Sequence, residues 1–164
     1  MEQGGGAFLD SAAGGRLGSR RLSATPTSSV VRLLRELIAL PSVNPAFLPE
    51  EDPRAGEGKV GDFLAARGAA GGLAAEFQEV LPGRRNVLLR YDPPGRTRRQ
   101  VLLAPHLDTV GSLDGSDGIF RPVVAGGRVW GRGACDTKGS VAAMLDALLA
   151  VSRGPDRPRQ TSVV

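Results

Sequence analysis

The chain has 164 residues and a net charge of +4, with 41% hydrophobic and 4% aromatic residues. This length and hydrophobic fraction exclude a wholly disordered chain and allow one domain with a mainly aliphatic core. The positive charge is nearly all arginine, scattered singly and in pairs without interleaved aromatic residues, so no nucleic-acid partner is expected.

Two features of the sequence concern the cellular compartment. Cys135 is the only cysteine, so no disulfide can form within the chain, which is typical of a reducing compartment and favours a cytoplasmic protein. No apolar run approaches the length needed to span a membrane, so no membrane partner is expected. Residues 1–27 are rich in Gly, Ala, Ser and Arg without a period, and they predict a flexible tail.

The first predicted elements are two helices. Apolar residues recur at helical spacing over residues 30–38, with Ser28 or Ser29 as the N-cap and Pro41 as the stop. A Pro- and acid-rich loop follows over residues 46–56. A second helix is expected from Glu57 to Arg67, ended by Gly68 and Gly71-Gly72.

Strand-like patterns dominate the middle of the chain. Residues 73–77 alternate and residues 86–91 are rich in β-formers, whereas Val101 to Ala104 form a continuous apolar run that suits a strand buried on both faces, over residues 100–105. Residues 111–118 predict a loop, and Gly126-Gly127 predicts a hairpin. An amphipathic helix is expected over residues 138–152 and the start of a further strand at residues 162–164, so the fold class is a layered α/β domain.

The first chemically suggestive segment directly follows the apolar run and contains His106 and Asp108. Residues two apart point to the same side of extended backbone, so an imidazole and a carboxylate emerge together where ligands bind in α/β sheets. Such a carboxylate is suited to act either as a second metal ligand or as the hydrogen-bond acceptor that orients a metal-binding histidine. The alternative is a lone histidine satisfied by local hydrogen bonds.

The second segment is the glycine-rich run from Val129 to Gly139. It places Asp136 at or just before the start of the 138–152 helix, where a carboxylate is favoured by the helix dipole, so a simple N-cap is the alternative to a metal ligand. The order Thr137-Lys138-Gly139 does not match a phosphate-binding loop, and Asp136 stands where a dinucleotide fingerprint requires glycine. Trp130 is expected in the core or in a pocket wall, and Cys135 is expected to be a small packed residue.

Together, the run from His106 to Val110 and the run from Gly131 to Gly139 resemble the M20 family of metallopeptidases and amidohydrolases, over roughly residues 30–152. Two further segments, Pro41 to Pro45 and Arg85 to Val87, resemble the family's sequences more weakly. The resemblance implies a three-layer α/β zinc-peptidase-like catalytic domain, of which residues 28–164 are expected to form an incomplete N-terminal part without the family's dimerisation domain. It also implies that homodimers form only in a longer parent protein.

The resemblance implies roles for three residues. His106 resembles a histidine that binds one of two zinc ions, Asp136 resembles the carboxylate that bridges both, and Asp108 resembles the catalytic-site aspartate that hydrogen-bonds the histidine. Zinc is the implied cofactor, and cobalt or manganese would also suit. Lys138 and Arg132 match the motif and are expected to give structural support.

The sequence departs from the family pattern after Asp136. The family's general-base glutamate, a second glutamate ligand and a second histidine come later in the chain, and here no glutamate follows Asp136 and His106 is the only histidine. The resemblance therefore implies a parent enzyme that hydrolyses an amide or peptide bond in an N-acyl amino acid or short peptide. The chain itself is expected to be inactive and to bind zinc weakly or not at all. The alternative is a non-catalytic domain of the same fold that binds a ligand or partner.

Overall fold

The computed structural model describes residues 28–49, 51–112 and 115–164, so the tail expected at residues 1–27 lies outside the described residues. Helices and strands follow in the order α1 (Ser29–Ile38), α2 (Gly58–Ala70), β1 (Ala74–Leu81), β2 (Arg84–Arg90), β3 (Arg99–Val101), β4 (Val123–Ala125), β5 (Arg128–Trp130), α3 (Lys138–Arg153) and β6 (Thr161–Val163). Short 3-10 helices occupy Pro45–Phe47 and Asp117–Phe120, the second of which begins within the expected 111–118 loop. No helix within these ranges is long and apolar enough to cross a membrane.

Helix α1 begins and ends where the sequence predicts. The hydroxyl of Ser28 accepts a hydrogen bond from the backbone N–H of Val31 at 3.4 Å, which satisfies one of the unpaired donors of the first turn. The helix ends at Ile38, because the residue before a proline disfavours helical backbone and Pro41 follows closely.

Helix α2 differs from the prediction at its end. It continues through Gly68 to Ala70, with Gly71 as the C-cap, so the prediction that Gly68 ends the helix was wrong. Gly68 is buried instead: a Cβ atom there would lie 2.8 Å from Cδ2 of Leu89. The glycine therefore lets α2 approach β2 closely.

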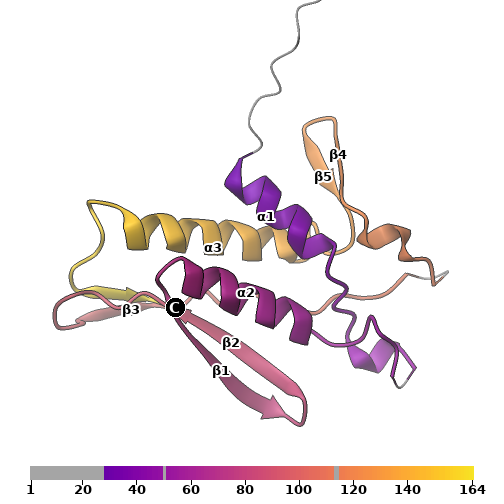
Figure 1. Ribbon diagram of the computed structural model, residues 1–164, viewed down its shortest axis with the longest axis horizontal. Coiled ribbons are helices and arrows are strands. Elements are labelled where there is room, and N and C mark those ends of the chain that lie inside the picture. Colours follow the sequence, from indigo (N-terminus) through magenta and orange to yellow (C-terminus); the bar gives the residue numbers. More distant parts are fainter. Residues whose placement is uncertain (1–27, 50, 113–114) are drawn as a thin grey trace, which may run out of the picture.

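The strands near the core follow the spatial order β1-β2-β6-β3. β1 and β2 form an antiparallel hairpin, β3 and β6 pair in parallel, and an antiparallel bridge between Tyr91 and Val163 joins the two pairs. The three helices lie on one side of these strands, and the C-terminus lies where the strands converge (Figure 1). The core fills the space between the helices and this face, and its buried members include Leu33, Leu37, Val60, Leu64, Leu73, Tyr91, Val141, Leu145 and Leu148.

The strand predicted over residues 73–77 is present as β1, which is exposed along its whole length. One expectation about strand burial was wrong. β3 stops at Val101 and is exposed, and the following Leu102 has 68% of its surface exposed, although residues 100–105 predict a strand buried on both faces. The cause lies in the neighbours: within the described ranges, helices cover one face of the strands, whereas a strand buried on both faces needs a layer on each side.

The hairpin of β4 and β5 is confirmed around Gly126 and Gly127. Their φ angles of 59° and 72° are those of a two-residue turn that matches the strand twist. Trp130, at the end of β5, has 55% of its surface exposed, so the prediction of a core or pocket-wall position was wrong. The hairpin stands apart from the core in Figure 1, and the indole N–H finds its acceptor locally, in the carbonyl of Ala125.

Candidate metal centre

The geometry of the candidate centre rests on two loops that are separated in the sequence by β4 and β5. His106 follows the β3 segment, and Asp136 lies between β5 and α3. Nε2 of His106 is 2.9 Å from Oδ1 of Asp136, and both side chains are exposed. Two residues thirty positions apart therefore present an imidazole and a carboxylate to one point on the surface.

Asp108 contacts the other ring nitrogen of the histidine. Nδ1 of His106 lies 3.0 Å from the backbone carbonyl oxygen of Asp108 and 3.2 Å from its Oδ1. A proton on Nδ1 donates to these oxygens and leaves Nε2 directed at Asp136. Such a contact fixes the tautomer and the ring orientation of a histidine that binds a metal.

Asn44 supports this arrangement, and sequence reasoning gave it no role. Its side-chain amide donates to Oδ2 of Asp108 at 2.8 Å. The backbone around it pairs with the His106 loop, because Thr109 N–H donates to Ser42 and Asn44 N–H donates to Thr109. The only signal in the sequence was the faint family echo from Pro41 to Pro45, which the structure places against the loop that carries His106.

Electrostatics link the three polar side chains. The hydrogen bond to Asp136, assisted by Asp108, raises the pKa of His106, despite some desolvation. Partial burial works to raise the pKa of Asp108, but the hydrogen bond from Asn44 and the nearby His106 outweigh it, and the net pKa is lowered. The site therefore favours an ionised Asp108 beside an imidazole that holds its proton more tightly than usual when no metal competes for it.

Asp136 does not act as the cap of α3. The N-cap residue is Thr137, and no side chain caps the helix there. The loop is fixed by its neighbours: Lys138 is buried and its ammonium donates to the carbonyls of Leu37 at 2.9 Å and Leu40 at 2.6 Å. The prediction that Lys138 gives structural support is confirmed, since it ties the start of α3 to the end of α1.

Cys135 is exposed, so the prediction of a packed residue was wrong. Cys135 lines a cavity of about 280 Å³ together with His106, Asp108 and Asp136. The histidine and both aspartates thus share one hollow at the surface.

The donors present fit part of a metal site. Imidazole nitrogen and carboxylate oxygen both suit zinc, and two ligand atoms of a tetrahedral zinc with bonds of about 2.0–2.1 Å lie about 3.3 Å apart. The observed separation of 2.9 Å between Nε2 of His106 and Oδ1 of Asp136 is close to that value. However, no group of three or more His, Cys, Asp or Glu side chains in the described part of the chain is arranged to hold a metal. The residues fit two positions of a ligand set that needs about four.

Sequence comparisons match the chain to one protein family and to several curated relatives. The model of the peptidase family M20/M25/M40 matches residues 102–164. Succinyl-diaminopimelate desuccinylase of Methylocella silvestris is 33% identical over 129 residues, covering 74% of this chain and 30% of that protein. The enzymes of the same name from Methylobacterium nodulans and Halorhodospira halophila are 37% and 36% identical, over 79% and 84% of this chain and 32% and 34% of their own lengths. The chain thus spans about a third of the length of these curated relatives.

Solved structures show the same fold. Human carnosine dipeptidase 1 superposes with a TM-score of 0.65 at 22% identity, covering 82% of this chain and 30% of that one. The M20 family metallo-carboxypeptidase Sso-CP2 from Sulfolobus solfataricus superposes with a TM-score of 0.60 at 17% identity, covering 84% and 30%. The expected α/β fold class, that of a zinc-peptidase-like catalytic domain of which this chain covers a part, is confirmed.

Proposed function

The chain belongs to the peptidase family M20/M25/M40, and we propose on that basis that it supplies part of a zinc centre for the hydrolysis of an amide bond. The observation that carries the proposal is the 2.9 Å approach of His106 Nε2 to Asp136 Oδ1. In this proposal the histidine and Asp136 hold metal, and Asp108 holds the imidazole in the tautomer that leaves Nε2 free to bind.

The contacts around His106 give each neighbouring residue a separate role in this proposal. A bound metal supplies Lewis-acid polarisation of the scissile carbonyl and lowers the pKa of water. Asp108 accepts a hydrogen bond from the Nδ1–H group of His106, which keeps the proton on Nδ1 and fixes the orientation of the ring. Asn44 holds the Asp108 carboxylate in turn. The family has two metal ions, and cobalt or manganese would suit the same oxygen and nitrogen donors.

We propose an N-acyl amino acid or a short peptide as the substrate class, and the desuccinylase names of the relatives favour an N-succinyl group. The 164-residue chain alone is proposed to be inactive, since it has one histidine and no glutamate after Asp136 to act as general base. Its single cysteine supports a reducing compartment such as the cytoplasm.

A zinc titration tests the metal assignment. We expect calorimetry on the chain to give at most one site, weaker than about 1 μM, or about 8 kcal/mol. The zinc-induced change in the His106 ring signals should disappear in Asp136→Asn and remain in Asp156→Asn, a matched change at an exposed aspartate outside the centre. Two sub-micromolar sites would contradict the proposal of an incomplete centre, and zinc binding that ignores both His106→Ala and Asp136→Asn would contradict the metal assignment.

Activity assays test the remaining parts. With zinc present, the chain should release no succinate or acetate from N-succinyl or N-acetyl amino acids, and turnover would contradict the proposed inactivity. In any longer protein that contains this chain, Asp136→Asn should remove hydrolysis of the same substrates by at least about a hundredfold, the cost typical of losing one electrostatic contact to the transition state. Unchanged turnover there would contradict the proposed hydrolytic role.

A further inference from the structure

The side chain of Arg54 fastens the loop before α2 to the loop that follows His106. Its Nε and Nη2 donate to the two carboxylate oxygens of Asp52, at 2.9 and 2.7 Å. Its Nη1 reaches the other loop, where it donates to the carbonyl of Gly115 at 2.8 Å and lies 3.3 Å from Oδ1 of Asp117. These contacts, the Arg54 bridge, join segments that are 61 residues apart in the sequence.

The loop that carries Arg54 also pairs through its backbone with the segment that carries Asn44. The N–H of Val43 donates to the carbonyl of Arg54 at 2.9 Å, and the N–H of Gly56 donates to the carbonyl of Val43 at 2.8 Å. On the other side of this segment, the N–H of Asn44 donates to the carbonyl of Thr109 at 2.9 Å. Asn44 therefore lies on a middle segment, between the loop that carries Arg54 and the loop that carries Thr109.

The middle segment needs both neighbours because it is buried. Val43 has none of its surface exposed, so the partners of its backbone N–H and C=O must come from the protein. The backbone pairings and the Arg54 bridge close a ring of contacts: from Arg54 to Val43, from Val43 to Thr109, along the chain to Gly115, and back to Arg54. The bridge therefore completes the ring that encloses the middle segment.

The ion pair in the bridge depends on the shape of the guanidinium as well as on its charge. Hydrogen bonds from the side chain and the backbone N–H of Arg54 lower the pKa of Asp52 to about 2, so its carboxylate stays ionised. A guanidinium can form two parallel bonds to this carboxylate and still direct another N–H at Gly115. A lysine ammonium is a single point of charge and cannot reproduce that fork.

Asn44 connects the ring to the candidate metal centre. Its side-chain amide donates to Oδ2 of Asp108 at 2.8 Å, and Asp108 in turn contacts Nδ1 of His106. Hydrogen bonds weaken steeply as their geometry worsens, so the position of the Asn44 backbone decides whether its amide reaches the carboxylate. Arg54 can therefore influence the orientation of His106 through Asn44 and Asp108.

We propose that Arg54 is a positioning residue for the candidate metal centre: its bridge holds Asn44 where the Asn44 amide orients the Asp108 carboxylate. Arg54 acts through these two residues and does not bind the metal. The proposal rests on the proposed function only in naming metal binding as the purpose of this orientation. The contact itself belongs to the metal-free chain and can be measured there.

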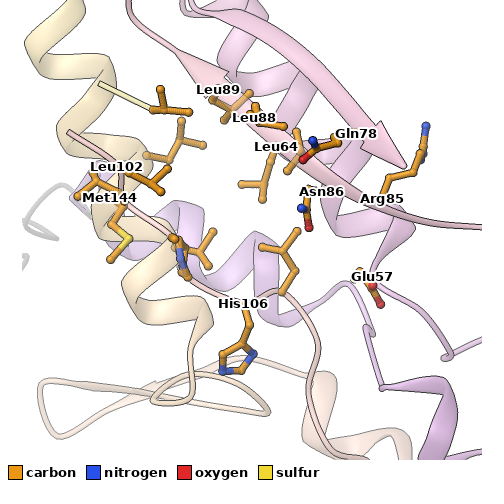
Figure 2. Close-up of a pocket in the computed structure, with 18 of the residues that line it drawn as sticks. Glu57, Leu64, Gln78, Arg85, Asn86, Leu88, Leu89, Leu102, His106 and Met144 are labelled. Carbon is orange, nitrogen blue, oxygen red and sulfur yellow. The ribbon is translucent and has the colours of Figure 1, made fainter. Parts of the chain in front are cut away.

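Asparagine side-chain signals in NMR report this contact directly. The chain has two asparagines, Asn44 and Asn86, so isotope labelling of asparagine alone gives two side-chain amide pairs. Asn86 comes from β2 and lines a cavity that His106 also lines, so it lies near the centre but outside the Arg54 bridge (Figure 2). The variant Asp108→Ala gives the position of the Asn44 signals without their acceptor.

In Arg54→Gln, we expect the Asn44 side-chain signals to move toward their position in Asp108→Ala, while those of Asn86 stay in place. The backbone N–H of Asn44 should exchange with solvent at least about tenfold faster than in the wild type. Arg54→Lys keeps the charge without the fork, so it should move the Asn44 signals in the same direction.

Arg90→Gln is the matched control for these variants. Arg90 pairs with Asp92, again two residues away, through an Nε–Oδ2 contact of 2.8 Å. This pair joins no distant segment, so its loss should leave the Asn44 signals and the exchange rate unchanged.

Three results would overturn the proposal. The first is an Asn44 contact and an exchange rate that remain those of the wild type in Arg54→Gln. The second is an equal change in Arg90→Gln. The third is wild-type behaviour of Arg54→Lys, which would leave no role for the fork; this variant also decides the matter if Arg54→Gln does not fold. Zinc that leaves the His106 ring signals of the wild type unchanged would contradict the proposed function and with it the purpose of the orientation, whereas the Asn44 contact is measured without metal.

Discussion

Replacing Gly139 with alanine tests whether the loop that carries Asp136 is held by close backbone packing. Gly139 lies in the first turn of α3, and a Cβ atom there would be 2.4 Å from the carbonyl oxygen of Ala134. Contacts under 3.0 Å between such atoms essentially never occur, so the loop must retreat by about 0.6 Å. A retreat of that size along the hydrogen bond would stretch the 2.9 Å separation between His106 and Asp136 to about 3.5 Å, where little hydrogen bonding remains.

The magnitude follows from two opposing terms. Overpacking typically destabilises a protein by about 1–3 kcal/mol, and replacing a helical glycine with alanine stabilises it by about 1 kcal/mol. Gly58, at the start of α2, is the matched control, because a Cβ atom there would have no neighbour within 4 Å. We therefore expect Gly139→Ala to be less stable than Gly58→Ala by about 1–3 kcal/mol.

Urea unfolding measures the stability difference, and titration of the His106 ring proton by NMR measures the site. Since the chain has one histidine, its ring signals need no assignment. We expect the pKa of His106 to fall toward its ordinary value in Gly139→Ala and to remain unchanged in Gly58→Ala. Equal stabilities together with an unchanged pKa of His106 would refute the reasoning that this glycine positions Asp136.

Three further predictions concern the supporting residues. In the metal-free chain, the pKa of His106 should exceed 6.5 and should fall in Asp136→Asn. The contact between the two side chains stabilises the fold below about pH 6.5, and this stabilisation is lost as the pH rises through the pKa of the folded state. An unchanged titration of His106 in the variant would contradict this prediction. Burial lowers the pKa of Lys138 from 10.5 to about 8, so the unfolded chain binds more protons than the folded chain between these pH values. The free energy of unfolding of the wild type, measured in urea, should therefore rise by up to about 3 kcal/mol from about pH 8 to pH 10.5. Lys138→Met should lack this rise. Asn44→Ala should raise the pKa of Asp108, measured from its side-chain carbon signal, and a fall would contradict the assigned hydrogen bond.

The sequence predicted elements well where the signal was local. The helical period with Ser28 placed α1, and Gly126-Gly127 placed the hairpin, because capping and turn chemistry depend on a few neighbouring residues. Gly68 shows the limit of such signals. A glycine near the end of a helical pattern resembles a stop, whereas here its lack of a side chain serves contact with Leu89, a residue of another element.

Burial was harder to predict, because it depends on which elements lie alongside. The apolar run after β3 has the composition of a fully buried strand, yet Leu102 is largely exposed, and helices cover one face of the strands in the described part of the chain. Trp130 is apolar enough for a core, but the two-stranded hairpin that carries it stands apart from the core in Figure 1, and the side chain is 55% exposed. The composition of a segment indicates the degree of burial that it favours, but the elements packed beside it determine how much of it is buried.

His106 and Asp136 lie close together although both side chains are exposed. Exposed side chains lose conformational freedom when they are held in one position, so other residues must hold these two in place. The residues that hold them are buried and carry no metal chemistry. Gly133, at φ +79°, lies against Lys138 and Thr109, where a Cβ atom would approach both side chains to 3.0 Å. Lys138 fixes the start of α3 to α1, while Thr109 pairs with the backbone of Ser42 and Asn44 behind Asp108. The glycine and lysine of the second motif therefore pack against the first motif, and this packing brings two exposed side chains, thirty positions apart in the sequence, within hydrogen-bond distance.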